Sequence, residues 1–410
     1  MRLSLTLVIG VVFTGLSPSQ PPQVPVAQGL VVHEWGVFRV QNDIAYANAD
    51  MRAIWDGLPK FVYGQLPGRE LPKHWNNYMI VDRPVLFFHS PQPLDINLQV
   101  DFPKGTAAVW WPGTQRPAVR SGVIYGSSMT SPSLEWKLRV KQPPSGNPRA
   151  PADVAVDSGS WVKTLRAVQA DDIYARVGEE NFGYEKEKFV YYDGLLPQGH
   201  WVDITVSGDN AAVVNRASHP VFDLTIIDRR PLDRIRVARL DQLGPKVEMK
   251  SLEFAELEAS KWPASGIDSL VNQLRRAGLN EDEAKSLVEL WKQELFQTEG
   301  VTLFYRLPQE EYDQWLPIQI KPLPEKMVRV GLVQHPHCEP DLAERIAAIV
   351  KDLNDDNFVR REQAQKRLES MGSAAFVHLQ RILRQSLPPE SKRRIERLLL
   401  QYDAARAMGR

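Results

Sequence analysis

The chain has 410 residues, of which 43% are hydrophobic and 24% are charged, and these values are ordinary for a soluble globular protein with two or three domains. Its 50 basic and 50 acidic residues give a formal net charge of zero, which argues against a nucleic acid or another polyanion as the partner. The one cysteine, Cys338, excludes an internal disulfide, so packing has to hold the fold together.

The N-terminus has the pattern of a secretory signal peptide. Arg2 precedes an uncharged, largely apolar run from Leu3 to Leu16, and small residues follow at Ser17 and Ser19. The run is shorter than the roughly 20 apolar residues that a membrane-spanning helix needs. We therefore predict a signal peptide over 1–19, a linker over 20–29 and export to the periplasm or the extracellular space. A retained N-terminal anchor is the alternative, and no other stretch is long and apolar enough to span a membrane.

Residues 30–334 show the alternation of a β-rich domain. In the segment "PLDINLQVDF", apolar side chains from Leu94 to Phe102 alternate with polar ones, which is typical of a strand with one buried face. The same period recurs around 136–140, 202–206, 222–226 and 235–237. Segments rich in proline and glycine separate these runs. This pattern predicts antiparallel sheets in a β-sandwich-like domain.

A helical hairpin is predicted to interrupt this domain over 265–297. Ser265 and Asp268 have the spacing of a capping box that opens a helix, and Gly278 stands where a helix would end. Asn280 and Glu283 then open a second helix with one apolar face. Strand-like segments follow the hairpin, which indicates an insertion that returns to the sheet.

The character of the sequence changes after a linker predicted at 335–340. Helical periodicity takes over in 341–405, and no tryptophan follows Trp315. Four short amphipathic helices in two antiparallel pairs are expected, and they must stack to bury their apolar faces. We predict a small all-α module.

Several separated motifs resemble a family of uncharacterised exported bacterial proteins whose mature part begins with a His-Glu-Trp-Gly-Thr-Phe motif. The motifs are "HEWGVF", "RPVLFFHSPQPLDINLQVDFPKG", "EKFVYYDGLLP" and "VTLFYRLP", in that order over 31–332. Val37 departs from the usual threonine, and His89 stands where tyrosine is common. The resemblance implies export and a shared architecture, but no reaction.

The C-terminal segment "LNDDNFVRREQAQKRLESMG" resembles a degenerate HEAT-like helical repeat. The residues that carry this likeness are Leu353, Asp355, Asp356, Phe358, Arg361, Glu362, Ala364, Leu368 and Gly372. Such modules usually serve in protein interaction or packing, so the resemblance implies a HEAT-like module over 341–405.

The "HEWG" motif offers candidate catalytic residues in Glu34 and His33. On a strand, Glu34 would lie on an otherwise apolar face, where an unpaired carboxylate is costly. Glu34 could act as a general acid, general base or ligand, or it could pair with an arginine or backbone amides as a structural lock. Adjacent strand residues point to opposite faces, so His33 and Glu34 should not share one small site without a bulge. The structural interpretation is favoured.

The "HPHC" segment supplies a candidate metal site at His335, His337 and Cys338, whose side chains suit zinc or copper. A fourth ligand would have to come from a distant histidine: His33, His74, His89, His200 or His219. A polar linker between two domains is the alternative, and it is favoured. The leading prediction is that the protein has no cofactor.

Two other groups of residues could bind ligands. Trp75, Trp110, Trp111 and Trp201 stand beside polar residues and could stack on sugars, although large aromatic side chains most often fill the core. A basic cluster near the last helices could meet an anionic partner, but a solvated helix face is favoured. Its residues are Arg381, Arg384, Lys392, Arg393, Arg394 and Arg397.

No GxSxG elbow, phosphate-binding glycine loop, HExxH or dinucleotide fingerprint occurs in the sequence. The leading prediction is therefore a non-catalytic exported protein that binds or scaffolds at the cell envelope, with an envelope protein or polysaccharide as its partner. The first alternative is a metal-dependent or carboxylate-based hydrolase of an envelope polymer that uses Glu34 and histidines. The second is a carbohydrate-binding module that uses the tryptophans.

Overall fold

The computed structural model describes residues 25–40, 58–59, 61–64, 78–103, 105–114, 132–144, 161–178, 183–199, 201–230 and 234–407. The predicted signal peptide lies outside these residues. Strand β1 (Val26–Val40) already begins within the segment that was predicted as a linker.

The described residues form three sheets. The largest has ten strands in the order β15 (Ala255–Glu258), β13 (Arg234–Leu243), β12 (Val221–Asp228), β16 (Val301–Arg306), β18 (Leu323–His335), β1, β3 (Tyr78–His89), β9 (Phe189–Pro197), β5 (Thr106–Trp111) and β2 (Tyr63–Gly64). A five-stranded sheet has the order β17 (Ile318–Lys321), β4 (Leu94–Asp101), β6 (Ser133–Val140), β7 (Ile173–Arg176) and β8 (Tyr184–Glu187). A three-stranded sheet has the order β10 (Val202–Ser207), β11 (Asn210–Asn215) and β14 (Glu248–Glu253).

The mainly β, antiparallel fold class is confirmed, and the strands predicted from alternation are present. In β4, Ile96, Leu98 and Val100 are buried while their neighbours face outward, as a period of two requires. One pairing in the large sheet is parallel: β1 runs alongside β18, the last strand of the domain. This pairing places both strands in the middle of the sheet, where elements cover them on both faces.

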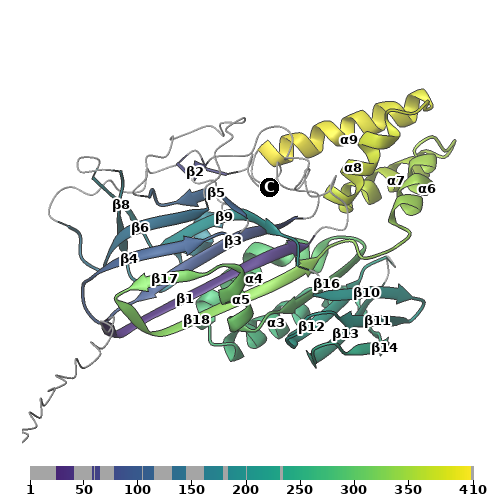
Figure 1. Ribbon diagram of the computed structural model, residues 1–410. Helices are drawn as coiled ribbons and strands as arrows, with labels where there is room; N and C mark the ends of the chain where they lie inside the picture. Colours follow the sequence, from purple (N-terminus) through teal and green to yellow (C-terminus); the bar gives the residue numbers. More distant parts are fainter. Residues whose placement is uncertain are drawn as a thin grey trace, which may run out of the picture.

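The ten-stranded sheet forms a central layer (Figure 1). The five-stranded sheet packs against one of its faces, where Tyr192 of β9 meets Phe102 and Trp136 at ring-centroid distances of 5.8 and 6.4 Å. Helices α3 (Ala264–Arg276) and α4 (Glu281–Lys292) cover the other face. The shorter helix α2 (Trp161–Arg166), from an earlier part of the chain, packs against α4. The central sheet therefore has a buried layer of side chains on each face. Strand β1 contributes alternate side chains to the two layers.

The inserted helical hairpin is confirmed. Gly278 follows α3 with a φ of 109°, a left-handed conformation that glycine adopts without strain, and Asn280 with Glu283 forms a capping box on α4. A π-helical turn (Gln293–Gln297) follows α4. The predicted capping box at Ser265 and Asp268 is wrong, because α3 begins one residue earlier, at Ala264, with Pro263 in the N-cap position.

The remaining helices are short. A 3₁₀ turn (Ala259–Lys261) precedes α3, and α5 (Gln309–Trp315) lies between β16 and β17. The tail contains the four expected helices: α6 (Leu342–Asp352), α7 (Phe358–Ser370), α8 (Ser373–Ile382) and α9 (Pro389–Ala407). Their apolar residues form a hydrophobic cluster of their own from Leu342 onward, whereas the cluster of the β-rich part ends at Cys338. A helical module thus follows a β-rich domain.

Buried ion pairs fix the tail helices to the β-rich part. Glu299, only 5% exposed, accepts from Arg345 of α6 at 3.0 Å and from the hydroxyl of Ser370 of α7 at 2.9 Å. Arg345 also donates to Glu339 at 3.0 Å. The contact between the two parts therefore includes two buried carboxylates, Glu299 and Glu339, that share Arg345.

We expect Glu299→Gln to loosen the helical module selectively. Arg345 would lose one of its two carboxylate partners and keep Glu339. A lost hydrogen bond to a charged group costs about 1–3 kcal/mol, so amide exchange in α6 and α7 should accelerate while exchange in β1 stays unchanged. Glu344→Gln is the matched control, because Glu344 is an exposed acidic residue of α6. Equal exchange in both variants would show that Glu299 does not fasten the module.

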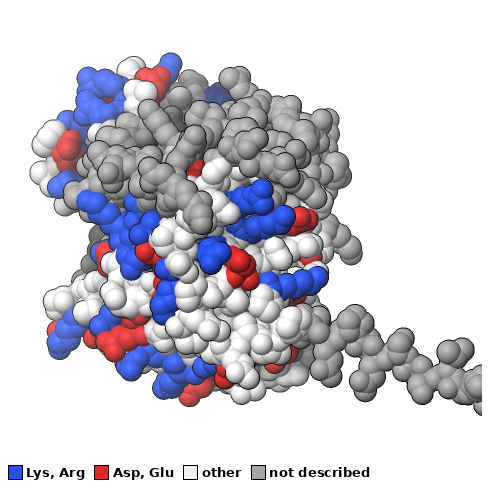
Figure 2. Space-filling view, turned by 90° about the vertical axis from the view of Figure 1, so that its left-hand side faces the viewer, with Lys and Arg blue, Asp and Glu red and all other residues white. Residues whose placement is uncertain are grey.

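On the face shown in Figure 2, basic and acidic groups are interspersed with uncharged ones, and basic groups cover more of the described surface than acidic ones. Within the part of the chain that the structure describes, no helix is both long and apolar enough to cross a membrane.

Candidate metal centre

Strand β1 sends His33 and Glu34 to opposite faces of the central sheet. Pleating alternates side chains, so Val31, His33 and Trp35 point towards the helices, while Glu34 and Phe38 point towards the five-stranded sheet and α5. The expected separation of the two residues is therefore observed. Glu34 cannot act as a general base for chemistry at His33.

Glu34 lies in a buried network of polar side chains. Its carboxylate is 0% exposed, accepts from Arg329 Nε of β18 at 2.5 Å, and also accepts from the hydroxyl of Tyr192. Arg329 donates further to Asp313 at 2.8 Å, and its guanidinium stacks 4.1 Å from the ring centroid of Tyr312. These are the contacts of the structural lock considered from the sequence.

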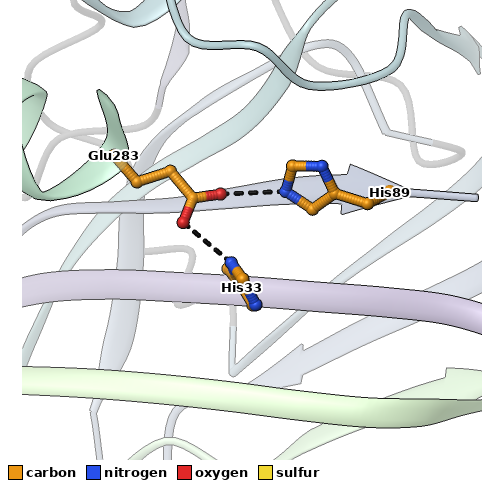
Figure 3. Close-up of side chains that lie close together, drawn as sticks. All are labelled: His33, His89 and Glu283. Atoms are coloured by element: carbon orange, nitrogen blue, oxygen red, sulfur yellow. Dashed lines mark hydrogen bonds and ion pairs between the residues drawn. The ribbon is translucent and has the colours of Figure 1, made fainter. Parts of the chain in front are cut away.

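His33 meets two partners on the other face: His89 of β3 and Glu283 of α4 (Figure 3). Its Nδ1 donates to Glu283 Oε2 at 2.7 Å, and His89 Nε2 donates to Glu283 Oε1 at 2.9 Å. The two rings lie 5.2 Å apart, and all three ligand atoms lie within 4.8 Å of one another. One carboxylate thus joins two imidazoles.

The register of the sheet brings the two histidines together. In the β1–β3 ladder Val31 lies opposite His89 and His33 lies opposite Phe87, so the histidines are diagonal neighbours on one face. Diagonal neighbours lie within reach of long and aromatic side chains. The third residue comes from the inserted hairpin, 250 positions away from His33.

Glu283 is held by its place in the first turn of α4. Its Oε2 accepts from the backbone N–H of Asn280 at 2.8 Å, which closes the capping box. Burial alone would raise the pKa of this carboxyl, but hydrogen bonds from His33 and His89 outweigh burial and lower the pKa to about 2. Glu283 is therefore an anion at neutral pH, as a metal ligand has to be.

The three side chains are a suitable set of metal ligands. Two imidazoles with one carboxylate occur at catalytic zinc sites and at non-haem iron sites. Zinc–nitrogen bonds are about 2.1 Å long, so small side-chain rotations would let these three atoms share one ion. Among the described residues this is the one group of three or more His, Cys, Asp or Glu side chains placed closely enough to do so.

Access to the cluster is from the side of His89. Its side chain is 24% exposed, whereas that of His33 is 5% exposed and that of Glu283 is fully buried. An ion held here would reach solvent past the imidazole of His89. The cluster therefore offers three protein ligands and is open to solvent only at His89.

Sequence reasoning found this cluster only in part. The sequence marks His33 as a catalytic candidate, but it marks His89 only as one of several distant histidines that could complete a site at "HPHC". Glu283 was recognised as a helix cap and missed as a ligand, because the capping box fully explains a glutamate at that position. No local signal in the sequence places α4 over β1.

The "HPHC" segment does not form the predicted metal site. His335 Nε2 contacts the hydroxyl of Tyr305 at 3.2 Å, and Cys338 Sγ donates to the backbone oxygen of His335 at 3.1 Å. Burial and then the nearby charges of Arg39 and Arg345 lower the pKa of His337 to about 3. His335 and Cys338 thus make separate contacts, and the three residues do not form a group close enough to share an ion. Strand β18 continues to His335, and the chain then turns at His337 with a φ of 54°.

The described tryptophans do not form an exposed sugar platform. Trp110, Trp111 and Trp201 are 4%, 1% and 3% exposed, and Trp111 Nε1 donates to the buried Glu187 at 3.0 Å. Trp110 and Trp111 are both buried because β5 lies inside a sheet that is covered on both faces. Trp75 lies outside the described residues.

The basic residues of the tail are partly neutralised by acidic neighbours. Arg394 pairs with Glu390 at 2.7 Å and with Glu362 at 2.9 Å, and Arg393 also contacts Glu390. Arg394 is 7% exposed and therefore does not belong to the solvated helix face favoured from the sequence. The other five residues of the cluster are exposed, in agreement with that prediction: Arg381, Arg384, Lys392, Arg393 and Arg397.

Comparison of the chain with protein-family models and with curated proteins finds no match. The resemblance to the exported family with the His-Glu-Trp-Gly-Thr-Phe motif therefore stays a prediction.

Proposed function

We propose that this protein is an exported binding protein of the cell envelope whose ligand is a divalent transition-metal ion, held by His33, His89 and Glu283. The observation that carries the proposal is the convergence of two imidazoles and one ionised carboxylate from three elements far apart in the sequence. Imidazole nitrogen favours zinc, copper, nickel or iron over calcium and magnesium, which prefer oxygen.

The burial of the cluster supports binding rather than incidental contact. Desolvating a carboxylate is costly unless hydrogen bonds or charges compensate for it, and here two imidazoles and a backbone amide surround Glu283. A divalent ion would neutralise the carboxylate more fully than the imidazoles do. The side chains of His33 and Glu283 are buried, so they would hold the ion in a defined geometry. A defined geometry favours affinity for the ion.

The proposal predicts that the metal-free full-length protein takes up one equivalent of zinc, nickel or cobalt(II). Binding should raise the free energy of unfolding by about 2.7 kcal/mol when the free ion is at 100 times its dissociation constant. Isothermal titration and thermal unfolding, with and without the ion, measure both effects. Calcium and magnesium should leave the melting temperature unchanged.

Two variants test the ligands without removing the helix cap. Glu283→Gln keeps the capping box, because glutamine also accepts the N-cap amide, but it removes the anionic ligand. His89→Gln removes the partly exposed imidazole. Each should weaken zinc binding by more than about 100-fold, which exceeds the range known for residues that only support a metal ligand.

His219→Gln is the matched control for these variants. His219 lies 3.3 Å from the carboxylate of Glu311, so it reproduces one half of the cluster without a second imidazole. This variant should bind zinc as the wild type does. Stoichiometric binding that survives in both Glu283→Gln and His89→Gln would refute the site, and so would a wild type that takes up no ion.

A further inference from the structure

A short segment after α2 touches the chain on both sides of His89. The carboxylate of Asp171 accepts from the backbone N–H of Ser90 at 2.6 Å, and the backbone N–H of Asp171 donates to the carbonyl oxygen of Phe88 at 3.0 Å. His89 lies between these two anchored residues, at the end of β3. The backbone that carries its imidazole is thereby fixed from both sides.

The same segment touches the residue that precedes Glu283. Asp282 accepts from the backbone N–H of Gln169 at 2.5 Å, and its other oxygen accepts from the backbone N–H of Glu283 at 3.0 Å. Gln169 is only two residues before Asp171. The segment 169–171 therefore joins the backbone around His89 to the first turn of α4.

A lysine adds to the fixation at the His89 end. Lys141 Nζ donates to the carbonyl oxygen of Ser90 at 2.7 Å and lies 3.7 Å from the carboxylate of Asp171. Its backbone N–H donates to the carbonyl oxygen of Asp172 at 2.7 Å. Ser90 is thus anchored through both its N–H and its C=O.

These contacts do not involve the atoms that would bind the ion. Asp171 and Asp282 interact with backbone groups beside the ligands, and neither contact uses a ligand atom of His89 or Glu283. His33 needs no such support, because the interior of β1 between β18 and β3 already fixes it. His89 and Glu283 instead lie at a strand end and in the first turn of a helix, where backbone positions are less constrained.

We propose that the segment 169–171 is the positioning element of the metal centre, and that Asp171 and Asp282 are positioning residues that set the separation of His89 and Glu283. This inference rests on the proposed function. Residues that orient metal ligands typically change metal affinity by about 10- to 100-fold when they are removed. The segment would act in this way without touching the ion.

Cobalt(II) is the probe that separates positioning from general stability, because its visible absorption reports the geometry of its ligands. In the full-length protein, Asp171→Ala and Asp282→Ala should each weaken cobalt binding by about 10- to 100-fold and change the shape of the bound-cobalt spectrum. Asp171→Asn retains an oxygen that can accept from Ser90, so it should restore most of the wild-type affinity and spectrum.

Asp203→Ala is the matched control, because Asp203 makes an exposed ion pair with Arg216 at 2.8 Å on β10. It should leave both cobalt readouts unchanged. If the wild type binds cobalt and both alanine variants bind it with unchanged affinity and spectrum, the positioning role is refuted while the metal site stands. If the wild type binds no cobalt or zinc, the proposed function fails, and the inference fails with it.

Discussion

Replacing Glu34 with alanine is expected to lower the free energy of unfolding by about 3–5 kcal/mol, because it leaves the guanidinium of Arg329 buried without its main partner. Both side chains of this pair are 0% exposed, and their closest atoms lie 2.5 Å apart. The alanine also removes the acceptor of the Tyr192 hydroxyl. Urea unfolding of the full-length protein measures the loss.

Two further variants test whether the buried Glu34–Arg329 pair affects stability more than an exposed ion pair does. The double variant Glu34→Leu with Arg329→Met removes both charges, so it should be more stable than Glu34→Ala although it has one more substitution. Glu256→Ala breaks the Arg234–Glu256 pair, in which both side chains are 53% exposed, and should cost at most about 1 kcal/mol. If Glu34→Ala lowers the free energy of unfolding by no more than Glu256→Ala does, the buried Glu34–Arg329 pair does not have the expected structural role.

Asp193→Asn is expected to make stability less dependent on pH. Asp193 accepts from the backbone N–H of Arg83 and from the hydroxyl of Tyr191, each at 2.6 Å. Burial, and then repulsion from the charge of Asp82, raise the pKa of Asp193 from its ordinary 3.8 to about 8. Hydrogen bonds from Tyr191 and Arg83 oppose these effects but do not outweigh them.

The sign follows from proton binding. Between pH 4 and pH 8 the folded chain holds a proton on Asp193 that the unfolded chain has released, so stability from this group falls as pH rises, by up to roughly 1.4 kcal/mol per pH unit. Asparagine imitates the protonated acid at every pH. The stability of Asp193→Asn relative to the wild type should therefore increase by roughly 2–3 kcal/mol from pH 6 to pH 8, as measured by urea unfolding at both values.

Asp82→Asn tests the cause of this shift. It removes the like charge beside Asp193 and should lower the pKa of Asp193, which moves the pH-dependent loss of stability to lower pH. A stability difference between Asp193→Asn and the wild type that stays constant from pH 6 to pH 8 would show that Asp193 is ionised throughout this range.

The strands and helices were predictable because each depends on local periodicity. Alternation in β4 and in β6 and the amphipathic patterns of α4 and of the four tail helices follow from which side chains must be buried. The start of α3 was misplaced by one residue, because Ser265 and Asp268 imitate a capping box that the chain does not use. Local patterns do not resolve such competition between neighbouring residues.

The sugar-binding interpretation of the tryptophans and the metal-binding interpretation of "HPHC", both less favoured from the sequence, have a common weakness. A sequence shows which side chains could bind a sugar or a metal, but it does not show what covers them. Trp110 and Trp111 lie in a sheet with cover on both faces, and His335 is the end of a central strand. The period-two rule assigns one side chain to each face of a sheet, and it does not tell whether a face is wet or dry.

The sequence by itself determined that His33 and Glu34 point to opposite sides of one strand, because pleating is a property of the backbone alone. It also determined that Glu283 opens a helix, because the capping box is a contact between residues three apart. Only the tertiary structure decided that Glu34 meets Arg329 and that His33 and His89 meet Glu283. Those contacts join residues 194 to 295 positions apart, and their geometry depends on how an inserted hairpin and a distant strand pack against β1, which no local pattern specifies.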